Sequence, residues 1–122
     1  MNNYKTVKEI TGKGYEYIVD EYGNKFWYLN DKLHREDGPA IELVNGTKVW
    51  YINGKRHREN GPAVEYADGN KYWYLNGKYH REDGPAIENK NGDKWWYING
   101  RNYGDKEPDN WICLVIEYKL MK

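Results

Sequence analysis

His34-Arg35-Glu36-Asp37-Gly38-Pro39-Ala40 is the stretch that decides the fold, because it recurs twice at a constant interval of 23 residues. It returns as His57-Arg58-Glu59-Asn60-Gly61-Pro62-Ala63 and as His80-Arg81-Glu82-Asp83-Gly84-Pro85-Ala86. A second motif recurs in phase with it: Trp27-Tyr28-Leu29-Asn30, Trp50-Tyr51-Ile52-Asn53, Trp73-Tyr74-Leu75-Asn76 and Trp96-Tyr97-Ile98-Asn99. Self-similarity at a fixed short period indicates a repeat array, in which each unit covers apolar surface of its neighbour.

Each unit begins with a segment that is rich in aromatic residues and bounded by turn residues, which is typical of a β-strand. The expected first strands are 25–29, 48–52, 71–75 and 94–98, and the expected second strands are 40–43, 63–66 and 86–88. The first strands are followed by Asn30-Asp31, Asn53-Gly54, Asn76-Gly77 and Asn99-Gly100. Asn-Gly favours the type I′ hairpin turn because both central residues must adopt positive φ, and Asn30-Asp31 is the weakest match.

The sequence therefore predicts an all-β protein: an elongated, curved single antiparallel sheet of about four 23-residue β-hairpin repeats with degenerate terminal caps. We expect one domain over residues 1–122, with an N-terminal cap (1–22), the repeats (23–104) and a C-terminal cap (105–122). Residues 15–19 are expected to pair with the next strand and cap that edge. Residues 111–120 alternate in the manner of a strand, so we expect a capping strand there, with a closing helix as the alternative.

Composition excludes several classes of protein. Nineteen basic and nineteen acidic side chains leave a net charge of zero, whereas nucleic acids and anionic membranes are bound by basic surfaces. An aromatic content of 16% is too high for a disordered chain. Cys113 is the single cysteine, and no apolar run approaches the ~18 residues of a spanning helix. We therefore expect a cytoplasmic protein, in the host cytoplasm if a phage encodes it, that binds neither nucleic acid nor membrane.

The three histidines, His34, His57 and His80, occupy the same register, which raises the question of a metal site. Ligands of one zinc ion must approach within a few Å of each other, but equivalent residues of successive repeats should lie ~10 Å apart. We therefore expect no metal and no cofactor, and structural histidines that bond to the backbone of turns.

Arg35, Arg58 and Arg81 also recur in register, and guanidinium groups suit phosphate well. Each arginine is followed by glutamate, and Glu42, Glu65 and Glu88 recur further along each unit. Alternating signs in every unit favour internal pairing of arginine with carboxylate. A nucleotide pocket, in which the arginines hold phosphate beside aromatic rings, is the alternative.

Two aromatic columns have different significance. Trp27, Trp50, Trp73 and Trp96 are constant, which favours packing, whereas the neighbouring column varies from unit to unit: Phe26, Val49, Tyr72 and Trp95. Variable aromatic positions on a sheet suit partner contact, so these four residues, with Arg35, Arg58 and Arg81, are the candidate partner-binding set. The chain contains no serine, and Cys113 lies far in sequence from any histidine, so we expect no enzyme.

The motif Tyr-x-Asn-Gly-Lys-x-His followed by Gly-x-Ala, within a 23-residue frame over residues 23–103, resembles the MORN repeat. The closer resemblance is to the variant that carries His-Arg-Glu-Asp-Gly-Pro-Ala, in bacterial, phage and giant-virus proteins. The resemblance implies a curved sheet of hairpins without enzymatic activity, and roles in scaffolding, self-association or binding of lipid head groups. For the variant it implies an immunity or counter-defence role.

We therefore expect a non-enzymatic protein-binding module that inhibits or neutralises a partner protein. A binder that sequesters a nucleotide or phosphorylated metabolite is the alternative, and a self-associating scaffold, as a homo-oligomer, is the third reading.

Overall fold

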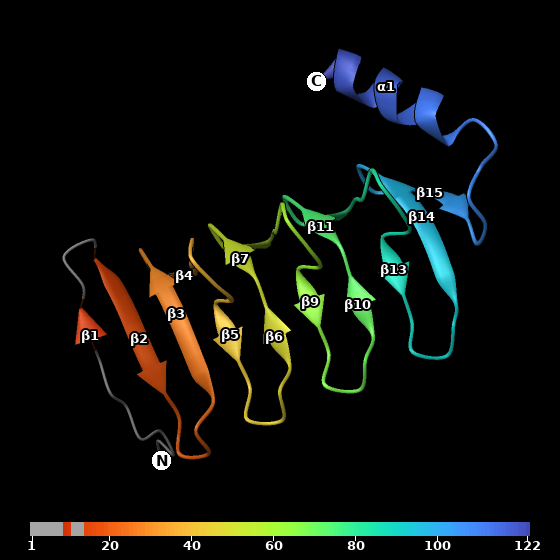
Figure 1. Cartoon of the computed structure of the whole chain (residues 1–122). Coiled ribbons are helices and arrows are strands. Elements are labelled where there is room, and N and C mark those ends of the chain that lie inside the picture. Colours follow the sequence, from red (N-terminus) through yellow and green to blue (C-terminus); the bar gives the residue numbers. More distant parts are fainter. Residues whose placement is uncertain (1–8, 11–13) are drawn as a thin grey trace.

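The computed structural model describes residues 9–10 and 14–122 and forms an open antiparallel sheet with a helix at its C-terminal end (Figure 1). The strands are β1 (Glu9–Ile10), β2 (Tyr15–Val19), β3 (Lys25–Leu29), β4 (Lys32–Leu33), β5 (Ile41–Glu42), β6 (Lys48–Val49), β7 (Tyr51–Ile52), β8 (Lys55–Arg56), β9 (Val64–Glu65), β10 (Lys71–Tyr72), β11 (Tyr74–Leu75), β12 (Lys78–Tyr79), β13 (Ile87–Glu88), β14 (Lys94–Ile98) and β15 (Arg101–Gly104), and the helix is α1 (Trp111–Met121). The predicted all-β array of hairpin repeats is confirmed.

Within the described residues, the main sheet follows the chain as a meander, in the order β1-β2-β3-β5-β6-β9-β10-β13-β14-β15. Its central strands place charged residues of alternating sign side by side: Lys25, Glu42, Lys48, Glu65, Lys71, Glu88 and Lys94. Opposite charges on facing strand positions stabilise a sheet by roughly 0.2–1 kcal/mol a pair. The zero net charge of the chain therefore reflects charges that cancel locally, repeat by repeat.

The recurring His-Arg-Glu-Asp/Asn-Gly-Pro-Ala segments leave the sheet as three loops (34–40, 57–63 and 80–86), which we call the arginine loops. In the first, both ends meet one residue of β3: the carbonyl of Trp27 accepts from His34 N–H (3.0 Å), and its N–H donates to the carbonyl of Ala40 (2.8 Å). Trp50 and Trp73 make the equivalent pairs of bonds. Each loop therefore interrupts a return strand, whose second part is two residues long and shorter than predicted.

The turns that follow the aromatic segments are type I′, as predicted, because both central residues have positive φ. Asn53 and Gly54 have φ of 50° and 78°, and Asn30-Asp31 adopts the same form at 51° and 65° without a glycine. The three later turns are also held by the preceding repeat. The Asn53 N–H donates to His34 Nδ1 (2.8 Å), and the same bond recurs from Asn76 to His57 and from Asn99 to His80. The predicted structural role of the histidines is confirmed.

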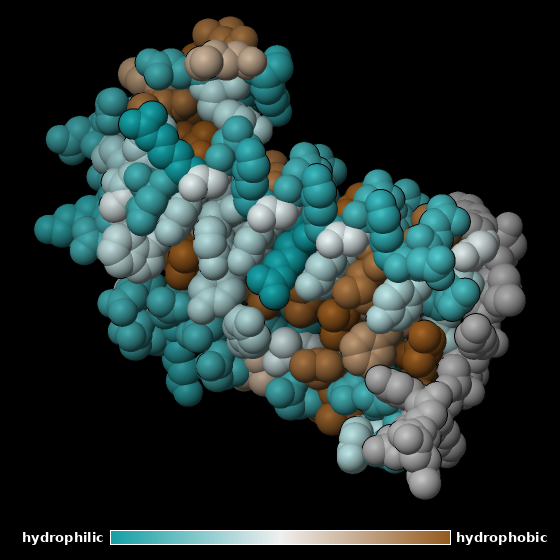
Figure 2. Space-filling view, turned by 180° about the vertical axis from the view of Figure 1, so that it is seen from behind, coloured by the Kyte–Doolittle hydropathy of each residue, from teal (hydrophilic) through white to brown (hydrophobic). Residues whose placement is uncertain are grey.

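The sheet has two faces of different character. We call the side that carries the arginine loops, with Trp27, Trp50 and Trp73, the loop face, and the opposite side the aromatic face. The core cluster of the aromatic face contains Val49 and Val64, with Tyr72 and Tyr79 packed against it. Figure 2 views the molecule from behind and shows hydrophobic residues gathered over the N-terminal strands, with paler residues continuing toward the helix.

The two ends of the array differ from the repeats. β2 pairs with β3 as predicted, but β1 pairs with the outer side of β2, so residues 15–19 do not form the edge. At the other end, the prediction of a capping strand over residues 111–120 is wrong, because this segment is helical. Trp111, Leu114, Val115 and Tyr118 follow helical spacing and pack against the buried Trp96 and Ile98.

The helix occupies the place that a fourth arginine loop would take (Figure 1). In this unit Gly104 stands where the other repeats have arginine, so no guanidinium covers Trp96. Trp111 is 5% exposed and buries the Trp96 ring instead. The helix thus closes the loop face at the C-terminal end. Within the described residues, no helix has the length and apolar character needed to cross a membrane.

Candidate functional site

The core of each arginine loop is a guanidinium group held between an aromatic ring and a glycine. Arg81 Cζ lies 3.9 Å from the centroid of the Trp73 ring. On its other side, a Cβ added to Gly84 would lie only 2.8 Å from Cζ. The group also donates from Nη1 to the Pro85 carbonyl (3.1 Å) and to Glu88 Oε2 (3.2 Å). Arginine, tryptophan and glycine therefore form one packed unit.

The same unit recurs in the other two loops. Arg35 lies 3.9 Å from the Trp27 centroid and pairs with Glu42 (3.0 Å), and Arg58 lies 3.8 Å from the Trp50 centroid and pairs with Glu65 (3.0 Å). The predicted internal pairing of arginine with carboxylate is confirmed in all three repeats. Because the guanidinium groups cover one face of each ring, these tryptophans act as packing residues, as predicted.

The three loops differ in one contact. Arg35 Nε donates to Asp37 Oδ1 (3.1 Å), and Arg81 Nε donates to Asp83 Oδ1 (3.0 Å). In the middle loop the corresponding residue is Asn60. Among the described residues, Arg58 pairs only with the carboxylate of Glu65. The middle loop is therefore one negative charge short of its neighbours.

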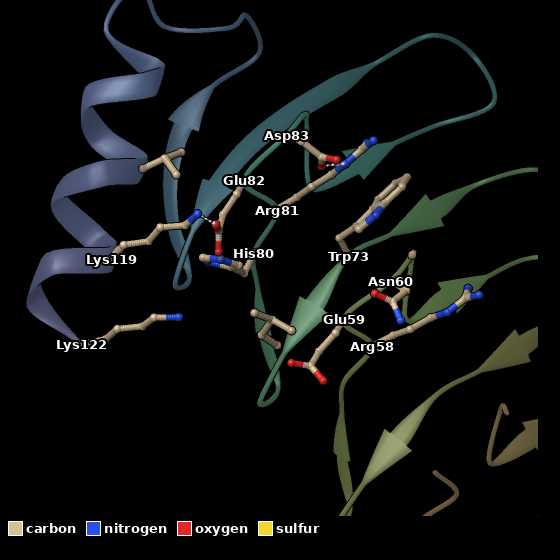
Figure 3. Close-up of a pocket in the computed structure, with 13 residues that line it drawn as sticks. Arg58, Glu59, Asn60, Trp73, His80, Arg81, Glu82, Asp83, Lys119 and Lys122 are labelled. Atoms are coloured by element: carbon tan, nitrogen blue, oxygen red, sulfur yellow. Dashed lines mark hydrogen bonds and ion pairs between the residues drawn. The ribbon is translucent and has the colours of Figure 1, made fainter. Parts of the chain in front are cut away.

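Two grooves lie between successive arginine loops on the loop face. The N-terminal groove has a volume of about 760 Å³, and the C-terminal groove, drawn in Figure 3, has about 880 Å³. Trp50 and Trp73 line them respectively, and the middle loop forms a wall of both through Arg58, Glu59 and Asn60. The lining of the C-terminal groove contains four cationic side chains and three acidic ones: Arg58, Arg81, Lys119, Lys122, Glu59, Glu82 and Asp83.

The helix supplies one wall of the C-terminal groove, and Glu82 fastens it there (Figure 3). The carboxylate of Glu82 contacts His80 Nε2 (3.0 Å) and Lys119 Nζ (3.1 Å). The backbone carbonyl of Glu82 accepts a hydrogen bond from Trp111 Nε1 (2.8 Å). The hydrogen bond from His80, reinforced by Lys119, lowers the pKa of the Glu82 carboxyl below its usual range. The sequence did not single out these helix residues, because the apolar residues of this segment fit strand alternation as well as helical spacing.

The four variable positions predicted to bind a partner lie in one row across the aromatic face. Cross-strand pairing orders the row as Phe26, Ile41, Val49, Val64, Tyr72, Ile87 and Trp95. Exposure differs along it: Val49 is 8% exposed and Val64 is fully buried, whereas Trp95 is 36% exposed. The middle of the row is therefore core, and the accessible ring lies at the C-terminal end.

Tyrosines surround the C-terminal part of this row and contact one another. The rings of Tyr74 and Tyr97 lie 4.5 and 4.9 Å from that of Tyr79, and Tyr66 meets Tyr72 edge-on at 5.6 Å. Burial raises the pKa of Tyr79 above the ordinary value for a tyrosine. Tyr66 is 41% exposed. The rings thus form a preformed aromatic surface, which we call the aromatic patch, defined by Tyr66, Tyr72, Tyr79, Tyr97 and Trp95.

The predicted set is therefore divided between the two faces. The structure brings Phe26, Val49, Tyr72 and Trp95 together on the aromatic face and holds Arg35, Arg58 and Arg81 on the loop face. Among residues 14–122, no three metal-ligating side chains converge on one point. No family model, curated protein or solved structure matches this chain.

Proposed function

We propose that this chain is a non-enzymatic protein-binding repeat module that contacts its partner through the aromatic patch. The observation that carries the proposal is a preformed cluster of aromatic rings on a sheet face that no other element of the described residues covers. The helix packs against Trp96 and Ile98, on the opposite face. Exposed tyrosine and tryptophan are enriched among the residues that dominate binding energy in protein interfaces.

The size of the aromatic face suits a protein partner. The row from Phe26 to Trp95 crosses seven adjacent strands of the sheet. At ~4.8 Å between strands the row is about 29 Å wide, and the strands at its two ends, β3 and β14, are five residues or about 17 Å long. A square patch of the ~800 Å² that each partner contributes to a standard interface measures about 28 Å along one side, so the row spans such an interface in this direction.

The loop face supports the nucleotide alternative less well. A nucleotide pocket needs an exposed ring for the base and a free guanidinium for the phosphate. Here the rings of Trp27, Trp50 and Trp73 are stacked against Arg35, Arg58 and Arg81. Binding of a base to these rings and of a phosphate to these guanidinium groups would therefore compete with the contacts that hold the arginine loops together.

The proposed biological role is neutralisation of the bound partner, as an inhibitor or as an immunity or counter-defence protein. This part rests on the resemblance of the repeats to the MORN variant and on the absence of a nucleophile–base arrangement in the sequence. A self-associating scaffold is the remaining reading, and the native mass of the purified chain separates it from a monomeric inhibitor.

The test is an affinity capture from the native host with the wild-type chain and three variants, two of them at neighbouring residues and the third Tyr72→Ala. Trp95→Ala removes an exposed ring of the aromatic patch, and Lys94→Ala, one residue earlier, removes an exposed side chain of the other face. We expect a partner that the wild type and Lys94→Ala retain and that Trp95→Ala and Tyr72→Ala lose. Equal capture by all four chains would contradict the proposal.

A thermal-shift panel tests the alternative directly. A nucleotide present at 100 times its Kd stabilises the folded chain by ~2.7 kcal/mol, which is a readily measured shift in melting temperature. The protein-binding proposal predicts no shift with any nucleotide. A shift that Arg58→Ala abolishes would favour sequestration instead.

A further inference from the structure

We propose that Arg58 forms a carboxylate-binding site on the loop face, at the wall shared by the two grooves. The proposal starts from the middle arginine loop. In the first and third loops an aspartate of the loop itself accepts from arginine Nε, at 3.1 Å in Asp37 and 3.0 Å in Asp83. In the middle loop Asn60 replaces that aspartate, and the described residues supply no carboxylate to Arg58 Nε.

The guanidinium of Arg58 is nevertheless held as firmly as its two counterparts. It stacks on Trp50 at 3.8 Å and donates from Nη1 to the Pro62 carbonyl (3.0 Å) and to Glu65 Oε2 (3.0 Å). The same contacts fix Arg81 in the third loop. Because both groups are fixed in the same way, the Nε edge of Arg58 is preorganised for an acceptor that its own loop does not provide.

The position beside Arg58 Nε is accessible to a ligand. In the other two loops the aspartates that fill it are 88% exposed, so the position faces solvent and not the sheet. Arg58 and Asn60 also line both grooves, which meet at the middle loop. In Figure 3 the side chains of Arg58 and Asn60 lie together at the edge of the C-terminal groove. A ligand can therefore reach the site along either groove.

The structure also indicates the chemistry of the ligand. In both neighbouring loops the group that accepts from arginine Nε is a carboxylate, so the matching ligand is a carboxylate of the same size. Glu59, Glu82 and Asp83 line the C-terminal groove as well and disfavour a multiply charged anion such as phosphate. The carboxylate can belong to an acidic side chain of a protein or to a small free acid. The site lies on the opposite face from the aromatic patch and does not rest on the proposed function.

The test follows the Nε–H signals of the three loop arginines by nuclear magnetic resonance. Sodium acetate, the peptide acetyl-Gly-Asp-Gly-amide and sodium phosphate are titrated separately into the wild-type chain at constant ionic strength. We expect a saturable shift of the Arg58 signal with acetate and with the peptide, while the Arg35 and Arg81 signals stay in place because their Nε groups are occupied. Phosphate should bind more weakly than acetate.

Two variants provide matched controls. Asn60→Asp gives the middle loop the residue that both neighbours carry, so it should fold normally and abolish the Arg58 response. Asp83→Asn opens the third loop and should make the Arg81 signal respond to acetate. An Arg58 signal that does not saturate, that moves equally in Asn60→Asp, or that moves no more than the Arg35 signal would overturn the proposal. A peptide affinity at least tenfold above that of acetate would assign the site to protein side chains, and a peptide affinity at least tenfold below it would assign the site to free acids.

Discussion

Replacing Gly84 by alanine tests the packed unit of arginine, tryptophan and glycine that defines each loop. Gly84 does not need glycine for its backbone conformation, because its φ lies outside the left-handed region. The added Cβ would lie 2.8 Å from Arg81 Cζ, where ordinary contacts begin near 3.4 Å. The guanidinium has little room to retreat, because it already lies 3.9 Å from the Trp73 ring centroid on its other side. Gly84→Ala should therefore displace Arg81.

The expected loss follows from the contacts of Arg81. Its stacking on Trp73 contributes about 1 kcal/mol, and the hydrogen bond to the Pro85 carbonyl contributes about 1 kcal/mol more. The partly exposed pair with Glu88 adds roughly 0.5 kcal/mol. Against this loss of about 2.5 kcal/mol, the alanine restricts the unfolded chain and returns about 0.4–1 kcal/mol. Gly84→Ala should thus lower the free energy of unfolding by about 2 kcal/mol.

Urea denaturation followed by tryptophan fluorescence measures this change, and a double-mutant cycle isolates its cause. In an Arg81→Ala background the added methyl group has no guanidinium to displace. Gly84→Ala should then be neutral or stabilise the chain by up to about 1 kcal/mol. If the substitution costs the same with and without Arg81, or costs less than about 0.5 kcal/mol in the wild type, the packed unit does not exist as described.

Three other substitutions test separate contacts. His57→Ala removes the acceptor of the Asn76 N–H and should lower the free energy of unfolding by about 1 kcal/mol in urea denaturation. Asp31→Gly relieves a positive φ of 65° and should raise the free energy of unfolding by about 0.5 kcal/mol in the same assay. Because the pKa of Glu82 is lowered in the folded chain, its contribution is complete above the ordinary value near 4.3 and is lost as the pH falls through the lowered pKa. Acid titration should therefore destabilise the wild type more than Glu82→Gln, and equal slopes would contradict the contacts of Glu82 with His80 and Lys119.

The repeat architecture was predictable because each signal occurs several times in the sequence. The 23-residue period, the Asn-Gly turns and the alternation of arginine with glutamate all point to the same structure. The interruption of the return strand was harder to foresee. Its cause is geometric: both ends of an arginine loop bond to a single residue, such as Trp27. In the next two repeats the predicted strands 48–52 and 71–75 are themselves split at this residue, Trp50 and Trp73.

The C-terminal helix was mispredicted because its sequence fits two periods. Ile112, Ile116 and Leu120 are apolar but exposed, at 75%, 50% and 80%. Together with the buried side, they leave Glu117 and Lys119 as the charged residues of the helix and erase the amphipathic signal that distinguishes a helix from a strand. The choice depends on tertiary packing against Trp96, a ring left uncovered because Gly104 replaces the arginine. The sequence alone did not indicate that residues 111–121 would lie against the uncovered ring of Trp96.

Candidate contact residues were predictable by type, but their exposure was not. Val49 and Trp95 occupy equivalent positions in different repeats, yet neighbouring side chains bury the first and leave the second accessible. Val49 is flanked by Ile41 and Val64 on the two neighbouring strands, whereas among the described residues Trp95 pairs with Ile87 alone, because β15 pairs with β14 only over 96–98. The site of contact therefore depends on place in the sheet as much as on the residue.

Hydroxyl-radical footprinting of two adjacent tryptophans tests the division of the sheet into two faces most directly. Trp95 on the aromatic face is 36% exposed, and Trp96 on the loop face is 9% exposed. Trp95 should therefore be oxidised about four times faster in the free chain, in proportion to these fractions, and should be the one protected when a captured partner is added. Equal rates, or a partner that protects only the arginine loops, would contradict the account.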